Sequence, residues 1–267
     1  MAGPINSAQR RRDAAAARVT STVGAVKKDI TDRLILFLLG VASLHRMSAT
    51  TDGGSHSTYR ALHSPMVHSS YETVDLLDFT HENRYKFLTG SVVPRPIALV
   101  TSQNDEGVLN AAPFSQFVIL SVTPPLLGIV AQTLPRGYKD TVHNVLRTGQ
   151  FVINVVSDEM ADQVQKCAVE YPSTVSEVDE VGFSTLPSVT VLPRRISESP
   201  LQFECRLHEH HEFGAPDSRT TMLVGEVILV HSAQGVREGH RVNHDVLRPL
   251  GRIAGRSYCR TQDTLTA

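Results

Sequence analysis

The chain has 267 residues, of which 41% are hydrophobic and 20% charged, and its formal net charge is −1. These values are typical of a soluble globular protein, and they exclude a broad electrostatic attraction to nucleic acid or to an anionic membrane surface. The three cysteines, Cys167, Cys205 and Cys259, form no C-x-x-C pair. This spacing favours reduced thiols in a cytoplasmic protein over a disulfide framework or a cysteine-based zinc site.

Residues 1–70 differ in composition from the rest of the chain, and we expect them to form a disordered or weakly helical tail. The apolar run from Leu34 to Ala42 is too short to span a bilayer, which takes about 20 apolar residues. Ser, Thr, His and Gly dominate residues 48–70, which is typical of a flexible linker. An alternative hypothesis is that translation starts at Met47 or Met66. The folded domain is expected to cover residues 71–267.

From residue 71 onward the pattern predicts mostly strands with a few short helices. Pro124 and Pro125 cannot lie in the middle of a sheet, so they are expected at an edge or at a strand end. The order of elements favours a barrel or sandwich with decorating helices over a doubly wound sheet. The expected strands are 97–102, 117–122, 126–131, 151–156, 189–192, 201–208 and 222–231, and the expected helices are 140–149 and 158–168.

Several common cofactor and catalytic motifs are absent from the sequence. There is no G-x-G-x-x-G fingerprint, no G-x-x-x-x-G-K-[ST] loop, no G-x-S-x-G elbow and no H-E-x-x-H pair. A phosphate-bearing cofactor would therefore need another device to hold it.

The first segment that could provide one is 93–102. Pro94 and Pro96 hold Arg95 in an extended backbone, which places a guanidinium at the entrance of a buried strand. Thr101 and Ser102 offer hydroxyl groups at the far end of that strand. An ordinary strand with a surface arginine would fit the same residues.

The second segment is 110–117. Ala111 and Ala112 leave room for a flat ligand against the backbone, and Asn110, Ser115 and Gln116 supply donors and acceptors beside it. An irregular strand with a bulge is the alternative interpretation.

The third segment is 138–144, where a helix is expected to begin. A helix N-terminus offers free backbone N–H groups to anions, and here Lys139 adds a charge and Thr141 a hydroxyl. The combination predicts a phosphate cradle, although a lysine beside a helix cap is common.

In order and spacing, these segments and later ones resemble the flavin reductase-like, FMN-binding split-barrel proteins. The resemblance runs from about Phe87 to Tyr258. The family's strand often carries Trp at the position where this chain has Leu99. The matching segments are 94–97 with 101–102, 110–115, 124–125, 139–144, 151–154, 198–205, 225–227 and 249–258.

The resemblance implies a homodimer with FMN near the subunit interface. By this resemblance Lys139 and Thr141 would help to hold the phosphate, whereas Arg252 and Tyr258 could serve either the interface or the barrel. No catalytic residue is assigned, because the flavin itself performs the hydride chemistry. The residues that would line the flavin site are Arg95, Thr101, Ser102, Asn110, Ala111 and Ser115.

The resemblance implies an NAD(P)H-dependent flavin reductase, which could supply reduced flavin to a separate oxygenase component. Two alternatives remain open: an FMN-binding electron carrier or storage protein without turnover, and a barrel that has lost its flavin. His208 and His210 could begin a metal site on one face of a strand. No further ligand has a supporting spacing, so a solvated strand end is the preferred interpretation.

Overall fold

The computed structural model describes residues 70–135, 137–215 and 218–262, so all but the last residue of the predicted tail lies outside the described part. Residues 73–267 form one compact unit. Its elements, in chain order, are η1 (Leu76–Asp78), α2 (His81–Ser91), β1 (Arg95–Pro96), β2 (Ala98–Gln103), β3 (Leu109–Phe114), β4 (Phe117–Val122), β5 (Pro125–Gln132), α3 (Asp140–Thr148), β6 (Gln150–Val155), η2 (Asp158–Met160), α4 (Ala161–Lys166), α5 (Glu177–Val181), β7 (Thr185–Leu186), β8 (Arg195–Ile196), β9 (Leu201–Phe213), β10 (Thr220–Ser232), β11 (Arg237–Glu238), β12 (Arg241–Val242), α6 (His244–Leu247), β13 (Leu250–Arg252) and β14 (Tyr258–Arg260).

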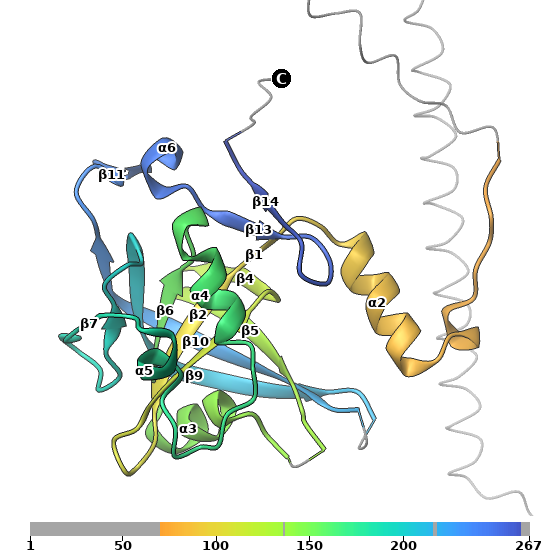
Figure 1. The fold of residues 1–267 in the computed structure, drawn as a ribbon, viewed down its shortest axis with the longest axis horizontal. Helices are drawn as coiled ribbons and strands as arrows, with labels where there is room; N and C mark the ends of the chain where they lie inside the picture. The colour runs from red at the N-terminus through yellow and green to blue at the C-terminus, as the bar shows by residue number, and fades with distance from the viewer. Residues whose placement is uncertain (1–69, 136, 216–217, 263–267) are drawn as a thin grey trace, which may run out of the picture. The chain divides into compact units, whose positions relative to one another are not determined.

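Strands dominate the fold and the helices are short, which confirms the predicted class (Figure 1). The main sheet has seven strands in the order β3-β2-β6-β9-β10-β5-β4, and every neighbouring pair is antiparallel. A separate sheet of three strands joins β1, β13 and β14. Pro124 lies between β4 and β5, Pro125 is the first residue of β5, and β4 is an edge strand, so the two prolines stand at a strand end as the sequence predicts.

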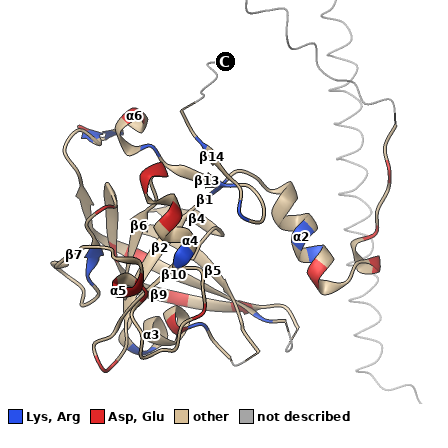
Figure 2. Ribbon diagram, in the orientation of Figure 1, with Lys and Arg blue, Asp and Glu red and all other residues tan. Residues whose placement is uncertain are grey.

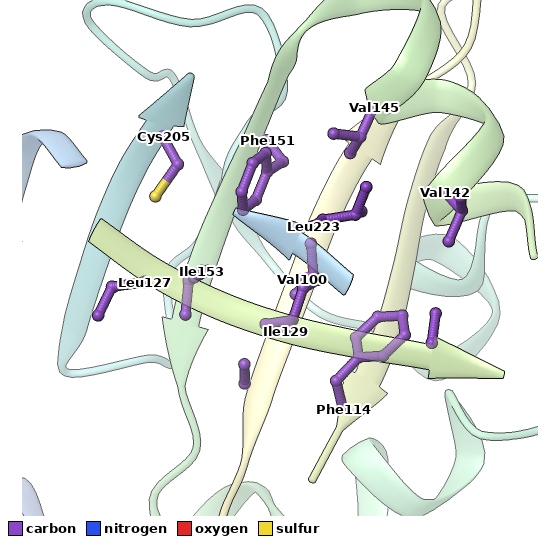
Figure 3. Close-up of a cluster of buried hydrophobic side chains, with 12 residues drawn as sticks. Val100, Phe114, Leu127, Ile129, Val142, Val145, Phe151, Ile153, Cys205 and Leu223 are labelled. Carbon is purple, nitrogen blue, oxygen red and sulfur yellow. The ribbon is translucent and has the colours of Figure 1, made fainter. Parts of the chain in front are cut away.

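The main sheet curls around one apolar core. Strands from distant places in the sheet order contribute to it, including Phe114 of β3, Ile129 of β5 and Phe151 of β6. Figure 3 shows β5 crossing β2 and β6, with Val100 and Ile153 among the buried side chains. A flat sheet could not bring β3 and β5 to the same cluster, so closure into a split barrel follows from burying these residues together.

The strand β2 is buried on both faces. Ala98 and Val100 belong to the barrel core, whereas Ile97 and Leu99 belong to a second cluster with residues of α4 and α5. Because successive side chains of a strand point to opposite faces, a strand covered on both sides reads as a continuous apolar run. This double burial explains why residues 97–102 are so strongly apolar in sequence.

The predicted strand 189–192 is wrong. These residues form a loop between β7 and β8, whose backbone is held by side chains of β9 and β6. Glu204 of β9 is fully buried and accepts hydrogen bonds from the N–H groups of Val189 and Thr190 at 2.7 and 2.6 Å. The N–H of Leu192 donates to Gln150 at 2.7 Å. Side chains thus satisfy the backbone groups that a strand partner would have taken.

Other boundaries also differ from the prediction. The predicted helix 158–168 divides into η2 and α4, and the last two predicted strands extend into the longer β9 and β10. Helix α2 was missed because none of its residues is buried, so it has no apolar stripe to detect. Its start does carry a sequence signal, since Thr80 caps the helix by accepting from the N–H of Asn83.

Among the residues that the model describes, no helix is long and apolar enough to cross a membrane.

Gly225 tests the packing of the barrel core. A Cβ atom at Gly225 would lie 2.3 Å from Cζ of the buried Phe151, so Gly225→Ala should lower the free energy of unfolding by roughly 1–3 kcal/mol. Gly90→Ala in α2 is the control, because nothing lies within 4 Å of that position. There the change should be neutral or stabilising by up to about 1 kcal/mol. Urea unfolding measures both; equal midpoints for the two variants would contradict the packing argument.

Glu204 should make stability depend on pH. Burial raises its pKa, but hydrogen bonds from Thr190, Val189 and His231 outweigh burial and lower the pKa from 4.5 to about 2. Because the folded-state pKa is the lower one, this stabilisation is present above about pH 4.5 and is lost as the pH falls towards 2. Glu204→Gln should reduce that slope and cost about 1–3 kcal/mol at pH 7.

Unfolding by urea between pH 2 and 7 measures this dependence. Glu238→Gln is the control, because Glu238 is exposed and its side chain forms no hydrogen bond or ion pair among the described residues. If Glu204→Gln kept the wild-type dependence of the unfolding free energy on pH and Glu238→Gln lost it, Glu204 would not be the group responsible.

Candidate functional site

Three adjoining hollows form a cleft around Pro113, which lines all of them. The largest, of about 540 Å³, lies between α2, β1, the end of β3 and the β13–β14 turn. A second, of about 80 Å³, lies at the start of α3, and a third, of about 90 Å³, shares Ser115 with the first and Lys139 with the second. We call the three together the cleft.

Arg95 lies at the largest hollow and is fixed by neutral oxygens. Its Nε donates to the Ser115 hydroxyl at 3.4 Å, and its Nη1 donates to the backbone oxygens of Thr89 and Val92. Its Nη2 has no partner among the described residues. The prolines on either side set the backbone, and the contacts to α2 and β3 then orient the guanidinium, leaving donors free for a ligand.

Lys139 is the residue immediately before α3, and it lines both smaller hollows. Its Nζ lies 6.0 Å from the centre of the Phe114 ring and, within the described ranges, pairs with no carboxylate. The first backbone N–H groups of α3 donate to no capping side chain at Lys139. A free ammonium beside a helix N-terminus is an environment that favours an anion.

A buried hydrogen-bond network fixes this end of α3 on the sheet. The Asn110 amide donates to the Thr141 hydroxyl at 2.9 Å and to the Ser102 hydroxyl at 3.4 Å. Asn144 also donates to Ser102, at 3.2 Å. Asn110 and Thr141 line the second hollow, whereas Ser102 is fully buried beneath it. The network therefore positions the helix terminus relative to Arg95 and Ser115.

The structure brings together five of the eight residues expected in the site. The five that line the cleft are Arg95, Asn110, Ser115, Lys139 and Thr141. Thr101, Ser102 and Ala111 are fully buried and line none of its three hollows. Thr101 donates to the backbone oxygen of Arg194 at 2.8 Å, and the N–H of Ala111 donates to Glu177 at 3.0 Å. Their side chains support the walls of the cleft.

Glu177 is a site residue that sequence reasoning missed. It comes from the short helix α5, and it lines the second hollow together with Cys167. Burial raises the pKa of Glu177, and nearby Asp140 raises it further. Burial and the charge of Glu177 also raise the pKa of Cys167 to about 12, so Cys167 remains a neutral thiol. The chain gives no motif for Glu177, because only the fold carries α5 to β3.

Arg252 and Tyr258 also line the largest hollow. Arg252 donates from Nη1 to the Tyr258 hydroxyl and to Gln165, the latter at 3.3 Å, and Tyr258 donates to Gln165 at 2.9 Å. From the sequence, this pair could serve either the interface or the barrel. In the structure both side chains line the cleft.

The histidines of β9 lie away from these residues, on an exposed strand end. His208, His210 and His211 are exposed, and His211 lies 3.3 Å from Glu209. Within the described ranges, no three His, Cys, Asp or Glu side chains are grouped as a metal site requires.

Comparison with known proteins gives the family. The model of the flavin reductase like domain matches residues 89–251. A protein of Halalkalibacterium halodurans is 33% identical over 190 residues, which cover 70% of this chain and 91% of that protein.

Solved structures agree with this match. Component B of nitrilotriacetate monooxygenase from Bacillus cereus is 29% identical, with a TM-score of 0.72, covering 75% of this chain and 100% of its own. The 2-nitrobenzoate 2-nitroreductase of Pseudomonas fluorescens is 35% identical, with a TM-score of 0.67, covering 73% of this chain and 95% of its own.

The curled antiparallel sheet is that of a split-barrel protein, and the family match defines its class as flavin reductase-like. With the family model matching more than half of its length, the chain belongs to the flavin reductase-like family.

Proposed function

We propose that this protein is an NAD(P)H-dependent oxidoreductase that binds FMN in the cleft and reduces it. The observation that carries the proposal is the joining of two environments in one cleft. One end has a lysine without a carboxylate partner beside a helix N-terminus. The other is a hollow of about 540 Å³ lined by apolar and aromatic side chains together with two arginines. FMN has one anionic end and one flat, amphipathic end, so it matches both.

Lys139, Thr141 and the first N–H groups of α3 would hold the phosphate. Glu177 lines the same hollow, and a charged carboxylate there would repel a phosphate; burial raises the pKa of Glu177 and so opposes its charged form. Pro113 and Ile97 offer an apolar wall to the ring, and Arg95 offers hydrogen-bond donors to its polar edge.

The bound flavin supplies the hydride chemistry. The residues of the chain bind and orient the cofactor, and no side chain needs to act as an acid or base in this proposal.

The likeness to a monooxygenase component supports a partner: reduced flavin would pass to a separate oxygenase. A cytoplasmic location would supply the nicotinamide donor and keep the thiols of Cys167 and Cys205 reduced.

We also propose a homodimer. Helix α2 buries none of its residues, and Tyr85, Phe87 and Leu88 are each more than 40% exposed. The edge strand β4 exposes Ile119 at 71% and Val122 at 83%. Figure 1 shows α2 standing away from the sheet. Exposed apolar surface of this kind on an edge strand marks an association surface, and a second copy would cover it.

Lys139→Met tests the site, because methionine keeps the packing over Phe114 and removes the charge. The dissociation constant for FMN should rise about tenfold or more, whereas that for riboflavin, which has no phosphate, should change little. Flavin fluorescence quenching measures both. Lys166→Met is the control, since Lys166 is exposed on α4 and lines no part of the cleft.

Anaerobic mixing with NADH or NADPH tests the activity. The expected result is steady oxidation of one nicotinamide with added FMN. Bound flavin that is reduced once without turnover would instead indicate an electron carrier, and a colourless protein that ignores FMN would refute flavin binding altogether.

Ile119→Asp tests the dimer. A charge on the exposed face of β4 should shift the protein from dimer to monomer in analytical ultracentrifugation, because burying an unpaired carboxylate costs several kcal/mol. Glu238→Asp, an exposed change outside α2 and β4, should leave the distribution unaltered. A wild-type protein that sediments as a monomer at all concentrations would rule out the dimer.

A further inference from the structure

Arg95 and Arg252 lie opposite each other on two neighbouring strands. In the antiparallel pairing of β1 with β13, Arg95 is the register partner of Arg252, and Pro96 is the partner of Gly251. A Cβ atom at Gly251 would lie 2.8 Å from Sγ of Cys259 and 2.9 Å from Cβ of Pro94, so the strands are tightly packed at this point. Like charges directly opposite in an antiparallel pair are destabilising.

No carboxylate among the described residues neutralises this pair. The largest hollow is lined by one acidic side chain, Glu82, and that side chain is paired with Lys86 one turn further along α2. The remaining charges of the lining are the two guanidinium groups. Figure 2 shows basic segments on α2 and on the β13–β14 turn, the two elements that contribute Lys86 and Arg252 to the lining. The arrangement therefore leaves an excess of positive charge inside a cavity.

Both guanidinium groups keep donors free for a ligand. Neutral groups hold Arg252: Tyr258 and Gln165 at Nη1, and the backbone oxygen of Gly255 at Nη2. Its Nε–H has no partner in the described part of the chain, and Nη2 carries a second N–H besides the one that Gly255 accepts. Nε and Nη2 form one edge of the planar guanidinium, and such an edge is where arginine binds an oxyanion.

We propose that Arg252, opposite Arg95, is a specificity-determining residue that binds an oxyanion on the molecule with which the flavin exchanges electrons. This inference rests on the proposed flavin function. The FMN phosphate is assigned to Lys139 at the other hollows, so the oxyanion at Arg252 belongs to a second ligand. Tyr258 and Gln165 hold the guanidinium in place, and Tyr258 adds an aromatic wall, with its ring centre 4.7 Å from the guanidinium carbon.

The oxyanion has two possible sources. One is a carboxylate on a small aromatic electron acceptor, and the other is a phosphate of the nicotinamide donor. Arginine can bind either group through two parallel N–H···O hydrogen bonds. The two sources differ in which molecule loses affinity when Arg252 is replaced.

Calorimetric titration tests the carboxylate source without any need for turnover. Benzoate and its neutral analogue benzamide are titrated into the FMN-loaded wild type and into Arg252→Gln, Arg252→Lys and Arg256→Gln. Benzoate should bind the wild type, and Arg252→Gln should weaken it about tenfold or more, with Arg252→Lys intermediate. Benzamide affinity should be the same in all four. Arg256→Gln removes a charge from the same turn outside the cavity lining and should match the wild type.

Steady-state kinetics test the phosphate source. If the nucleotide carries the oxyanion, Arg252→Gln should raise the KM for NADPH about tenfold or more, and NADH should be affected less because it lacks the 2′-phosphate. A charge-selective loss in either arm supports the proposal, since a merely structural role would affect charged and neutral ligands alike.

Either of two results would overturn it. One is that both arms fail: Arg252→Gln keeps both KM values within twofold of the wild type, and benzoate either binds the variant within twofold of the wild type or does not bind the wild type at all. The other is that Arg252→Gln weakens FMN but not riboflavin, which would assign the flavin's own phosphate to the arginine pair. Failure of the proposed function is distinct, because it appears in the wild type as absent FMN binding or absent nicotinamide oxidation.

Discussion

The burial of β2 on both faces is the constraint on which the remaining architecture depends. Val100 faces the barrel core and Leu99 faces the cluster under α4 and α5. A shift of the strand by one residue would move each side chain to the opposite face, where it would not fit. Its hydroxyl-bearing end, at Ser102, then anchors α3 through Asn110 and Asn144. Its other end leads back to β1 and Arg95. One strand thus fixes the distance between the two ends of the cleft.

The cleft combines cations that the fold leaves without acidic partners. Arg248 and Arg260 bind Asp158, but among the described residues Lys139 and Arg252 form no ion pair with a carboxylate. Water solvates these cations while the cleft is open. Their attraction to an anionic ligand becomes stronger when the ligand excludes that water, because the local dielectric constant falls. This electrostatic arrangement supports an anionic cofactor at one end and an anionic second ligand at the other.

Much of the fold could be predicted because β strands in this chain are either uniformly apolar or bounded by prolines and glycines. The runs at 97–102 and 151–156 are central strands, and Pro124 with Pro125 mark a turn. The failure at 189–192 has a physical cause: an apolar segment was held as a loop by Glu204, and no local pattern reveals a carboxylate that is distant in sequence. Helix α2 could not be predicted from apolar periodicity, because none of its faces is buried.

By itself, the sequence determined the class of fold, the extended backbone at Arg95 between two prolines, and the helix start at Lys139, because each depends on local backbone preferences. Only the tertiary structure decided which side chains share the cleft. It placed Thr101, Ser102 and Ala111 beneath the surface, brought Glu177 under β3, and set Arg252 opposite Arg95. Those contacts join residues far apart in the chain, and strand register and sheet closure, rather than local pattern, bring them together.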